Sequence, residues 1–196
     1  MKATKVKVLP DDNISLEVIK DFTIESISFN KHLKPETGSF SIGYIVGSSG
    51  SGKSVLLNEY NREEKYVWTG PVCSNFRNYT EAKNKLLGSG LSSIPAWLKP
   101  YEHLSTGQKH RADLAINLKN DAVFDEFTSV LDRNTAKGLA SSVEKFIRSN
   151  NITGVVFAGP HRDIISYLLP DWVFDTDLGV LYQDEITKPE PFLEIV

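Results

Sequence analysis

Runs of apolar residues divide the chain into the strands and helices of an α/β protein. Residues 40–46 and 122–124 read as short strands, and 154–159 is continuously apolar, which is typical of a strand in the middle of a parallel sheet. Two further strands are predicted at 172–175 and 180–182. Apolar residues recur at helical spacing over 136–147, which predicts a helix facing the core and capped by Asp132 or Asn134.

The first 46 residues are predicted to be rich in β-strand. Polar and apolar residues alternate from Lys5 to Leu9 and stop at a turn cluster, 10–13. The alternation returns over Ile14–Ile19 and Phe22–Phe29, so we expect an antiparallel β lead before the strand at 40–46. The candidate core residues of this lead are Ile24, Ile27 and Phe29.

Residues 61–103 carry the weakest pattern and are expected to form a short helical insertion. Tyr66–Trp68 is a candidate strand, and a helix is predicted to begin at Thr80 and to end at the glycines 88 and 90. A proline-bounded apolar loop follows over Ile94–Tyr101. Its aromatic side chains either pack against the domain or contact a partner; they are Trp97 and Tyr101.

Composition limits the class of protein. The 196 residues suffice for one domain, 1–196, with a substantial core. The net charge of −3 gives no overall field that would attract nucleic acid or an acidic membrane. No apolar run reaches the 18 residues of a membrane span, so no membrane insertion is expected. The single cysteine, Cys73, excludes an internal disulfide and fits a cytoplasmic location.

The segment Gly47–Ser54 has the spacing G-x-x-x-x-G-K-S, between a predicted strand and a predicted helix. Glycines let the backbone wrap a phosphate chain, and the wrapped N–H groups end at a helix N-terminus, where negative charge is stabilised. Lys53 is placed to meet the terminal phosphates, and the Ser54 hydroxyl to hold Mg²⁺. The predicted phosphate-binding residues are Gly47, Ser48, Ser49, Gly50, Ser51, Gly52, Lys53, Ser54 and Val55.

A second candidate anion site lies at Leu104–Gln108, where Ser105 and Gly107 open an amphipathic helix. One nucleotide seldom needs two cradles within one chain, whereas two facing chains would use both. The simpler alternative is an ordinary capped helix start.

Acidic and imidazole side chains follow two of the predicted strands. Asp125 and Glu126 end the strand 122–124; Asp125 is the candidate Mg²⁺ ligand and Glu126 the candidate base for an attacking water. His161 follows the strand 154–159, at the edge where open α/β sheets bind ligands, and is a candidate contact to the γ-phosphate. Phe22, with Phe29 behind it, is the candidate for stacking on a nucleotide base, although core packing explains either residue equally well.

These motifs together resemble the ATP-binding cassette (ABC) ATPases over about Phe22 to Tyr182. Walker A is followed by LSTGQ, a Walker B element ending in DE, the D-loop SVLD and a switch histidine, in family order. The stretches GLSSIPAWLKPYEHLSTGQKHRADLA, DEFTSVLDRNTAK and PHRDIISYLLPDWVFDT further resemble soluble prokaryotic and phage ABC-type ATPases that are sometimes fused to a predicted acetyltransferase.

The resemblance implies a P-loop NTPase fold and a head-to-tail homodimer with two ATP molecules between the subunits. Gly47–Ser54, Asp125, Glu126 and His161 would act on one nucleotide, with Lys53, Glu126 and His161 as the catalytic set. The nucleotide of the opposite subunit would be reached by Ser105, Gly107, Gln108 and Asp132.

Three departures from the family pattern stand out. Thr106 replaces the first glycine of the signature, and Phe127 stands where many members have proline. No glutamine lies between Ser54 and Ser105, so the Q-loop, which contacts the metal and couples transporters to their membrane partner, has no counterpart. Ser74 or Asn75 is a candidate substitute.

The function favoured by the sequence is a soluble ATP-driven switch that closes as a homodimer and is read by a soluble protein partner. The missing Q-loop and the short insertion weigh against a transporter subunit. The absence of a heptad arm and the acidic charge weigh against a nucleic-acid-processing head. A small-molecule kinase would leave LSTGQ and the DE pair unexplained.

Overall fold

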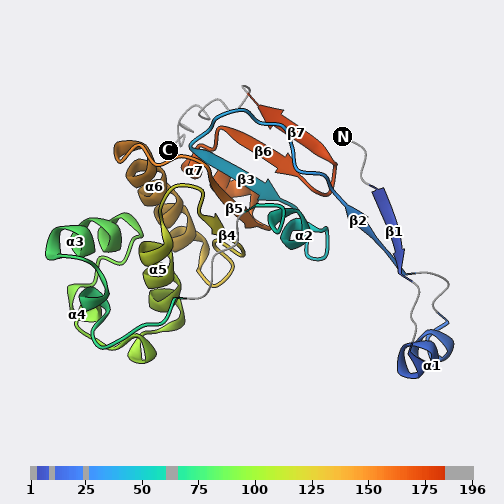
Figure 1. Ribbon diagram of the computed structural model, residues 1–196, viewed down its shortest axis with the longest axis horizontal. Helices are drawn as coiled ribbons and strands as arrows, with labels where there is room; N and C mark the ends of the chain where they lie inside the picture. Colours follow the sequence, from blue (N-terminus) through green and yellow to red (C-terminus); the bar gives the residue numbers. More distant parts are fainter. Residues whose placement is uncertain (1–3, 9–11, 24–26, 61–65, 184–196) are drawn as a thin grey trace, which may run out of the picture.

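The computed structural model describes residues 4–8, 12–23, 27–60 and 66–183 (Figure 1). A five-stranded sheet forms its centre, with strands in the order β4-β5-β3-β6-β7. The strands are β3 (Ile42–Val46), β4 (Val123–Phe124), β5 (Val155–Gly159), β6 (Trp172–Asp175) and β7 (Val180–Gln183). The first four are parallel, and β7 pairs antiparallel with β6. The prediction of a central, mostly parallel sheet is therefore confirmed.

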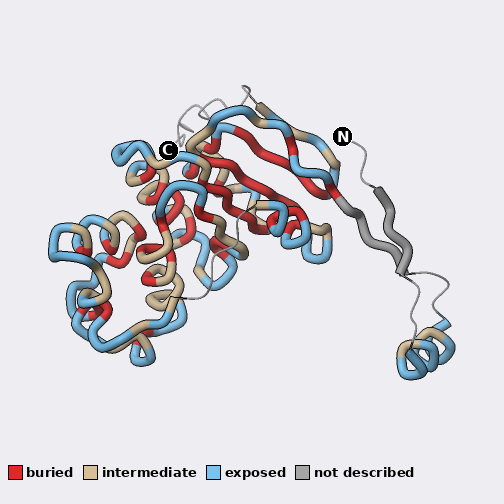
Figure 2. The backbone as a smooth tube through the Cα atoms, viewed as in Figure 1, coloured by how far each residue is buried: buried red, intermediate tan, exposed pale blue. Residues whose placement is uncertain are grey.

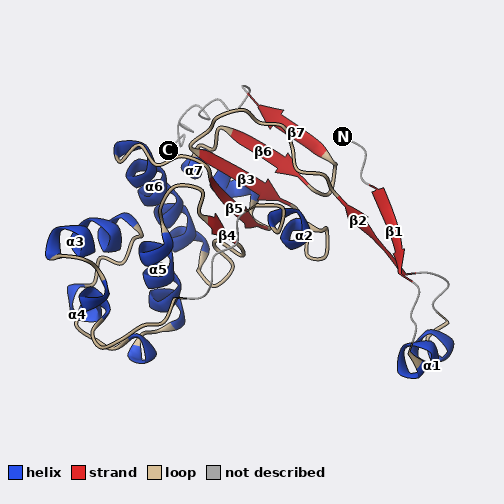
Figure 3. Ribbon diagram, viewed as in Figure 1, coloured by secondary structure: helices blue, strands red, loops and turns tan. Residues whose placement is uncertain are grey.

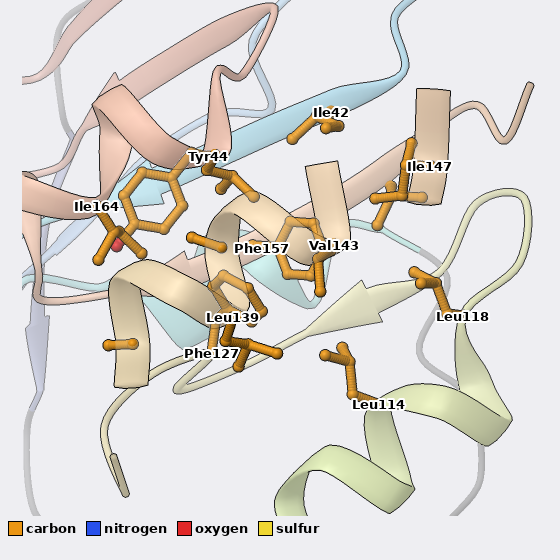
Figure 4. Packing of buried hydrophobic residues seen from close by; sticks show 14 of the residues in the cluster. Ile42, Tyr44, Leu114, Leu118, Phe127, Leu139, Val143, Ile147, Phe157 and Ile164 are labelled. Carbon is orange, nitrogen blue, oxygen red and sulfur yellow. The ribbon is translucent and has the colours of Figure 1, made fainter. Parts of the chain in front are cut away.

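Helices cover both faces of this sheet, as its continuously buried strands require. On one face, alternate side chains of β3 and β5, among them Tyr44 and Phe157, pack against α6 (Arg133–Ser149) through Leu139 and Val143 (Figure 4). On the other face, α2 (Lys53–Leu57) inserts Leu56 and Leu57 against the intervening positions of the same strands. Figure 2 shows β3 and β5 buried along their length.

The segment predicted as an insertion packs a second core of its own. It contains η1 (Val72–Asn75), α3 (Tyr79–Gly88), α4 (Ile94–Trp97) and η2 (Tyr101–His103). The long helix α5 (Thr106–Asn117) joins the two cores, because Leu114 packs towards the sheet while Ala112 and Ala115 pack towards the insertion. The helices η3 (Arg162–Ile164) and α7 (Ile165–Leu168) complete the fold between β5 and β6.

Two predictions in this insertion are corrected by the structure. Tyr66–Trp68 is not a strand; Trp68 instead donates from Nε1 to Asp113 Oδ1 at 2.9 Å and stacks on Tyr101. The predicted loop Ile94–Tyr101 begins with the short helix α4, and η2 starts at its last residue. Trp97 is buried and donates to the carbonyl of Leu91 at 2.7 Å, so it packs within the domain.

The N-terminal lead is an antiparallel pair, β1 (Thr4–Val8) with β2 (Ile27–Lys31), that carries the helix α1 (Asn13–Asp21) (Figure 3). The prediction of a strand over Ile14–Ile19 is wrong. Asp12 caps the helix by accepting from the Ser15 N–H at 2.9 Å, and no residue of α1 is buried. The run Phe22–Phe29 is also shorter as a strand than predicted, since β2 begins at Ile27. The candidate core residue Ile24, and the side chains of Ile27 and Phe29, lie outside the described residues.

Within the parts of the chain that the structure describes, no helix combines the length and the apolar character needed to cross a membrane.

Candidate functional site

The motif residues gather at one edge of the sheet because four parallel strands end there. Gly47 follows β3, Asp125 follows β4, and His161 lies two residues after the end of β5. Asp177 lies two residues after the end of β6, at the same edge. This is the edge at which open α/β sheets bind ligands.

The loop 47–54 takes a conformation that depends on its glycines. Gly50 and Gly52 have φ of +78° and +95°, in the left-handed region that other residues rarely adopt. A Cβ on Gly47 would lie 2.0 Å from Thr176 Oγ1, so no larger residue fits there. The loop ends at Gly52, the first residue before α2, and its amides therefore lie at a helix N-terminus, as the motif predicts.

Lys53 lies under this loop. Its side chain is only 5% exposed, and its ammonium donates to the carbonyls of Gly47 at 2.9 Å and Ser48 at 2.7 Å. The charge is thus held at the centre of the loop, beside backbone atoms rather than in open solvent.

A cavity of about 280 Å³ opens over the loop and Lys53. This volume lies just below the range of about 300–1,000 Å³ that is usual for small-molecule sites. Its wall consists of Ser49, Gly50, Gly52, Lys53, Ser54, Val55 and Glu126. The structure therefore brings the predicted base together with the phosphate loop.

Glu126 is held in an unusual backbone conformation. Its φ is +51°, which costs a residue with a side chain about 1–2 kcal/mol. Its N–H donates to Asp125 Oδ1 at 3.0 Å, and Ser129 donates from Oγ to Glu126 Oε2. The bond from Ser129 fixes the Glu126 carboxylate, and Glu126 lies on the cavity wall.

His161 is fixed by two bonds. Nδ1 lies 2.9 Å from Thr128 Oγ1, and the His161 carbonyl accepts from the Tyr44 hydroxyl at 2.9 Å. Burial, followed by the nearby Arg133 guanidinium, lowers the pKa of the ring below its ordinary value. The neutral imidazole is therefore favoured, which has one donor and one acceptor nitrogen.

The signature residues lie at helix starts. Ser105 Oγ accepts from the Gln108 N–H at 3.3 Å, while Gln108 Oε1 accepts from the Ser105 N–H at 3.1 Å. This reciprocal pair is a capping box at the start of α5. Asp132 likewise caps α6 by accepting from the Thr135 N–H at 3.0 Å. Ser105 and Asp132 therefore act as ordinary helix caps in this structure, as the simpler alternative predicts. The action of Ser105, Gly107, Gln108 and Asp132 across a dimer stays a prediction.

The structure does not bring Phe22 to the cavity of its own chain. The residue follows α1, which Figure 1 shows beyond the β1–β2 pair and away from α2, and its side chain is 75% exposed. Stacking of Phe22 on a base stays a prediction. The candidate Q-loop substitute Asn75 donates from Nδ2 to the carbonyls of Thr69 and Pro71, which ties it to its own turn.

Three residues near the loop were missed at the level of sequence. His32 is 3% exposed, lies with Nε2 3.2 Å from the Ser51 carbonyl, and packs on the ring of Phe174. Asp177 and Arg162 form a further contact to the loop, described below. Asp177 and Arg162 each carried a sequence signal, since each follows a strand that ends at the functional edge.

The donors available for a metal are few. Among the residues that the structure describes, no three His, Cys, Asp or Glu side chains are grouped to hold an ion. Mg²⁺ typically takes one or two protein oxygens and completes its shell with water and substrate phosphates. Ser54 on the cavity wall and the half-buried Asp125 at the end of β4 fit that mode.

Comparison with solved structures decides the fold. The ATP-binding cassette MJ0796 in a dimeric post-hydrolysis state, bound to ADP and Pi, matches 89% of this chain and 92% of its own, with a TM-score of 0.53 and 17% identity. The chain has the ABC cassette fold. Another dimeric structure of MJ0796, described as a bacterial ABC transporter cassette, matches 78% of the chain and 88% of its own (TM-score 0.51, 17% identity).

A third cassette-like match is a chain from the complex of the archaeal ribosomal stalk protein aP1 with the archaeal ribosome recycling factor aABCE1. It covers 75% of this chain but only 38% of the matched chain (TM-score 0.56, 16% identity). No protein-family model and no curated protein sequence matches. The chain thus shares its fold with cassettes of different roles.

Proposed function

We propose that this protein binds and hydrolyses ATP between the subunits of a head-to-tail homodimer and acts as an ATP-driven switch for a soluble protein partner. The observation that carries the proposal is the cavity in which Lys53, the loop amides and Glu126 meet. An ammonium and helix N-terminal amides attract phosphates, and a carboxylate on the opposite wall is placed to accept a proton.

The phosphate loop, Glu126 and His161 of one chain each have a separate task in this reaction. Lys53 and the loop bind the β- and γ-phosphates. Glu126 accepts the proton of the attacking water as the new O–P bond forms and the bond between the γ-phosphorus and the β-bridging oxygen breaks, which releases ADP and phosphate. His161 orients the γ-phosphate from the end of β5.

Ser54 and Asp125 would hold Mg²⁺. When bound, the ion would supply positive charge that neutralises the phosphates.

Dimerisation completes a site that one chain only half encloses. The cavity of about 280 Å³ lies just below the usual range for small-molecule sites, so the remaining walls of a nucleotide site have to come from elsewhere. The start of α5 offers a hydroxyl, backbone amides and a helix dipole, and both structures of MJ0796, a cassette with this fold, are described as dimeric. We infer that Ser105, Gly107, Gln108 and Asp132 of one chain close over the nucleotide of the other.

A transporter cassette is the second candidate, because one of the similar structures is described as a bacterial ABC transporter cassette. The region 61–103 does not support this role, because it has no glutamine for the Q-loop that couples transporter cassettes to their membrane partner. Co-purification with a membrane protein rather than a soluble one would decide for it.

Glu126→Gln tests the proposal. The variant keeps the side-chain volume and the ability to orient a water but removes the base, so ATP should bind and persist in a closed dimer. Size-exclusion chromatography should give a dimer with ATP and Mg²⁺ and a smaller species with ADP. Lys53→Ala is the control, because it removes a charge-assisted contact worth about 1.5–3 kcal/mol and should abolish the ATP-dependent dimer. The same oligomeric state in both nucleotides would contradict the proposal.

A further inference from the structure

The Asp177 carboxylate, which lies outside the motifs described above, is hydrogen-bonded to the phosphate loop. Asp177, in the turn after β6, accepts from the Ser48 N–H with both oxygens, at 3.0 and 2.9 Å, and from the Ser48 hydroxyl at 2.6 Å. Ser48 is the second residue of the loop. Because neighbouring Thr176 also meets the loop, with its hydroxyl 2.6 Å from Ser51 Oγ, the β6 turn supports the loop at two points.

Arg162 holds Asp177 in turn. Its terminal nitrogen Nη2 donates to Asp177 Oδ2 and to Asp175 Oδ2, both at 2.8 Å, and Nε donates to Asp175 Oδ2 at 3.2 Å. Asp175 is 4% exposed, and its other oxygen accepts from the N–H groups of Asp177 and Leu178. The guanidinium and the turn therefore form a closed network.

This network ends at the switch histidine, because Arg162 directly follows His161 in the chain. The path from His161 through Arg162 and Asp177 to Ser48 crosses from the end of β5 to the start of the loop after β3. The side chains thus join these two segments in addition to the strand pairing and to the Tyr44 hydroxyl, which donates to the His161 carbonyl.

We propose that Asp177 and Arg162 are positioning residues that hold the first turn of the phosphate loop and couple it to the segment carrying His161. The proposal deepens the proposed function and rests on it. The pKa of Asp177 agrees with the geometry, since the hydrogen bonds from Ser48 and Arg162 lower it to about 2 and keep the carboxylate ionised.

The direction of the change in ATP affinity distinguishes a positioning role of Asp177 from a purely electrostatic one. Asp177 adds a negative charge beside the loop that receives the phosphates, so its neutralisation should tighten ATP binding if only electrostatics counts. If Asp177 positions Ser48, Asp177→Asn should weaken binding about tenfold, the lower end of what a charge-assisted hydrogen bond contributes. Asp177→Glu should recover most of the affinity.

The chain offers a matched control at the other end of β3. Asp171 accepts from the N–H groups of Ser41 and Ile42 at 2.7 and 2.8 Å and pairs with Arg148 at 3.0 Å. It resembles Asp177 in exposure, 34% against 28%, but does not contact the loop. Asp171→Asn should lower the unfolding free energy without changing the dissociation constant for ATP.

The experiment is a double-mutant cycle measured by calorimetric titration of ATP into Asp177→Asn, Arg162→Gln and the double variant. Each single change should raise the dissociation constant about tenfold, and the double variant should be no weaker than the worse single, because both act through one network. Additive losses, or an unchanged or tighter affinity in Asp177→Asn, would overturn the coupling.

A second measurement needs no nucleotide. Amide hydrogen exchange over residues 47–54 should accelerate in Asp177→Asn and stay as in the parent protein in Asp171→Asn. Unchanged exchange in both variants would refute the positioning role. Failure of the parent protein to bind ATP, with faster loop exchange in Asp177→Asn, would contradict the proposed function and leave the positioning role supported.

Discussion

The backbone at Glu126 allows a prediction that separates stability from chemistry. Its φ of +51° lies in the region that glycine adopts freely and that costs other residues about 1–2 kcal/mol. Glu126→Gly and Glu126→Ala both remove the carboxylate and the contact with Ser129, so the difference between them isolates the backbone. Both should lose hydrolysis.

The magnitude follows from two opposing terms. Glycine relieves the strain of about 1–2 kcal/mol, but it loses about 0.5–1 kcal/mol more conformational entropy on folding than alanine does. Taken at the midpoints of these two ranges, the glycine variant should be more stable than the alanine variant by about 0.75 kcal/mol. For a chain of this size that corresponds to a melting temperature higher by roughly 1–4 °C.

Thermal and urea unfolding of the two variants measures this difference, and Gly138 supplies a control of opposite sign. Gly138 lies in α6, and a Cβ built on it meets nothing within 4 Å. Gly138→Ala should therefore stabilise the protein by about 0.5–1 kcal/mol. An alanine variant at 126 as stable as the glycine variant, beside a stabilised Gly138→Ala, would refute the strain at Glu126.

Three further predictions follow from single contacts. Ser105→Asp should keep α5 capped and the melting temperature unchanged, since aspartate caps a helix as well as serine does. The added carboxylate should repel the phosphates and abolish the ATP-dependent dimer on size exclusion. Dimerisation as in the parent protein would argue against a contact between Ser105 and the nucleotide. Gly43→Ala would place a Cβ 2.1 Å from the Trp172 ring and should cost about 1–3 kcal/mol in urea unfolding; no loss would show that the ring can move. The pKa of Asp177 in the folded protein lies below its ordinary value of 3.8, so the carboxylate adds to the unfolding free energy above about pH 4, and this stabilisation is lost as the pH falls towards 2. In Asp177→Asn the unfolding free energy should therefore fall less steeply with acid over that range. An unchanged dependence on pH would contradict the pairing of Asp177 with Ser48 and Arg162.

Sequence was sufficient for the central sheet and for the edge where the motifs meet. Continuous apolar runs identify strands buried on both faces, and the carboxyl ends of parallel strands share one edge. Gly47, Asp125 and His161 each follow such a strand, so their common edge was predictable from pattern alone. The structure places all three at that edge, and Glu126, which follows Asp125, lines the cavity over the loop, while their roles towards a nucleotide stay predictions.

The sequence misled at α1 because a short apolar run fits two periods. Ile14, Leu16 and Val18 alternate as in a strand, while Ile14, Val18 and Phe22 also recur every fourth residue as on a helix. The deciding contact is local, the Asp12 carboxylate on the Ser15 amide. Asp12, a residue type that commonly caps helices, was the sequence signal for a helix start, and the alternating pattern was given more weight than this signal.

The network around the loop was beyond reach for a different reason. Ser48 and Asp177 are 129 positions apart in the chain, and nothing in either local pattern records the pairing. It arises only because β3 and β6 are neighbours in the sheet, which places the turn after one strand beside the loop after the other. Strand order is set by the packing of the whole domain and therefore has to be seen in the fold.

The two interpretations of Ser105, as a helix cap and as a phosphate contact, are compatible because a hydroxyl has separate donor and acceptor functions. In the structure Ser105 Oγ accepts from the Gln108 amide, which uses one lone pair and leaves the O–H free to choose its acceptor. A phosphate oxygen is such an acceptor, and the dipole of α5 stabilises negative charge at the same point. The capping box then preorganises the serine: Gln108 fixes its backbone, so the hydroxyl need not be ordered when a facing nucleotide arrives. Helix capping by the hydroxyl oxygen and the proposed donation of its hydrogen to a nucleotide across the dimer would thus not compete.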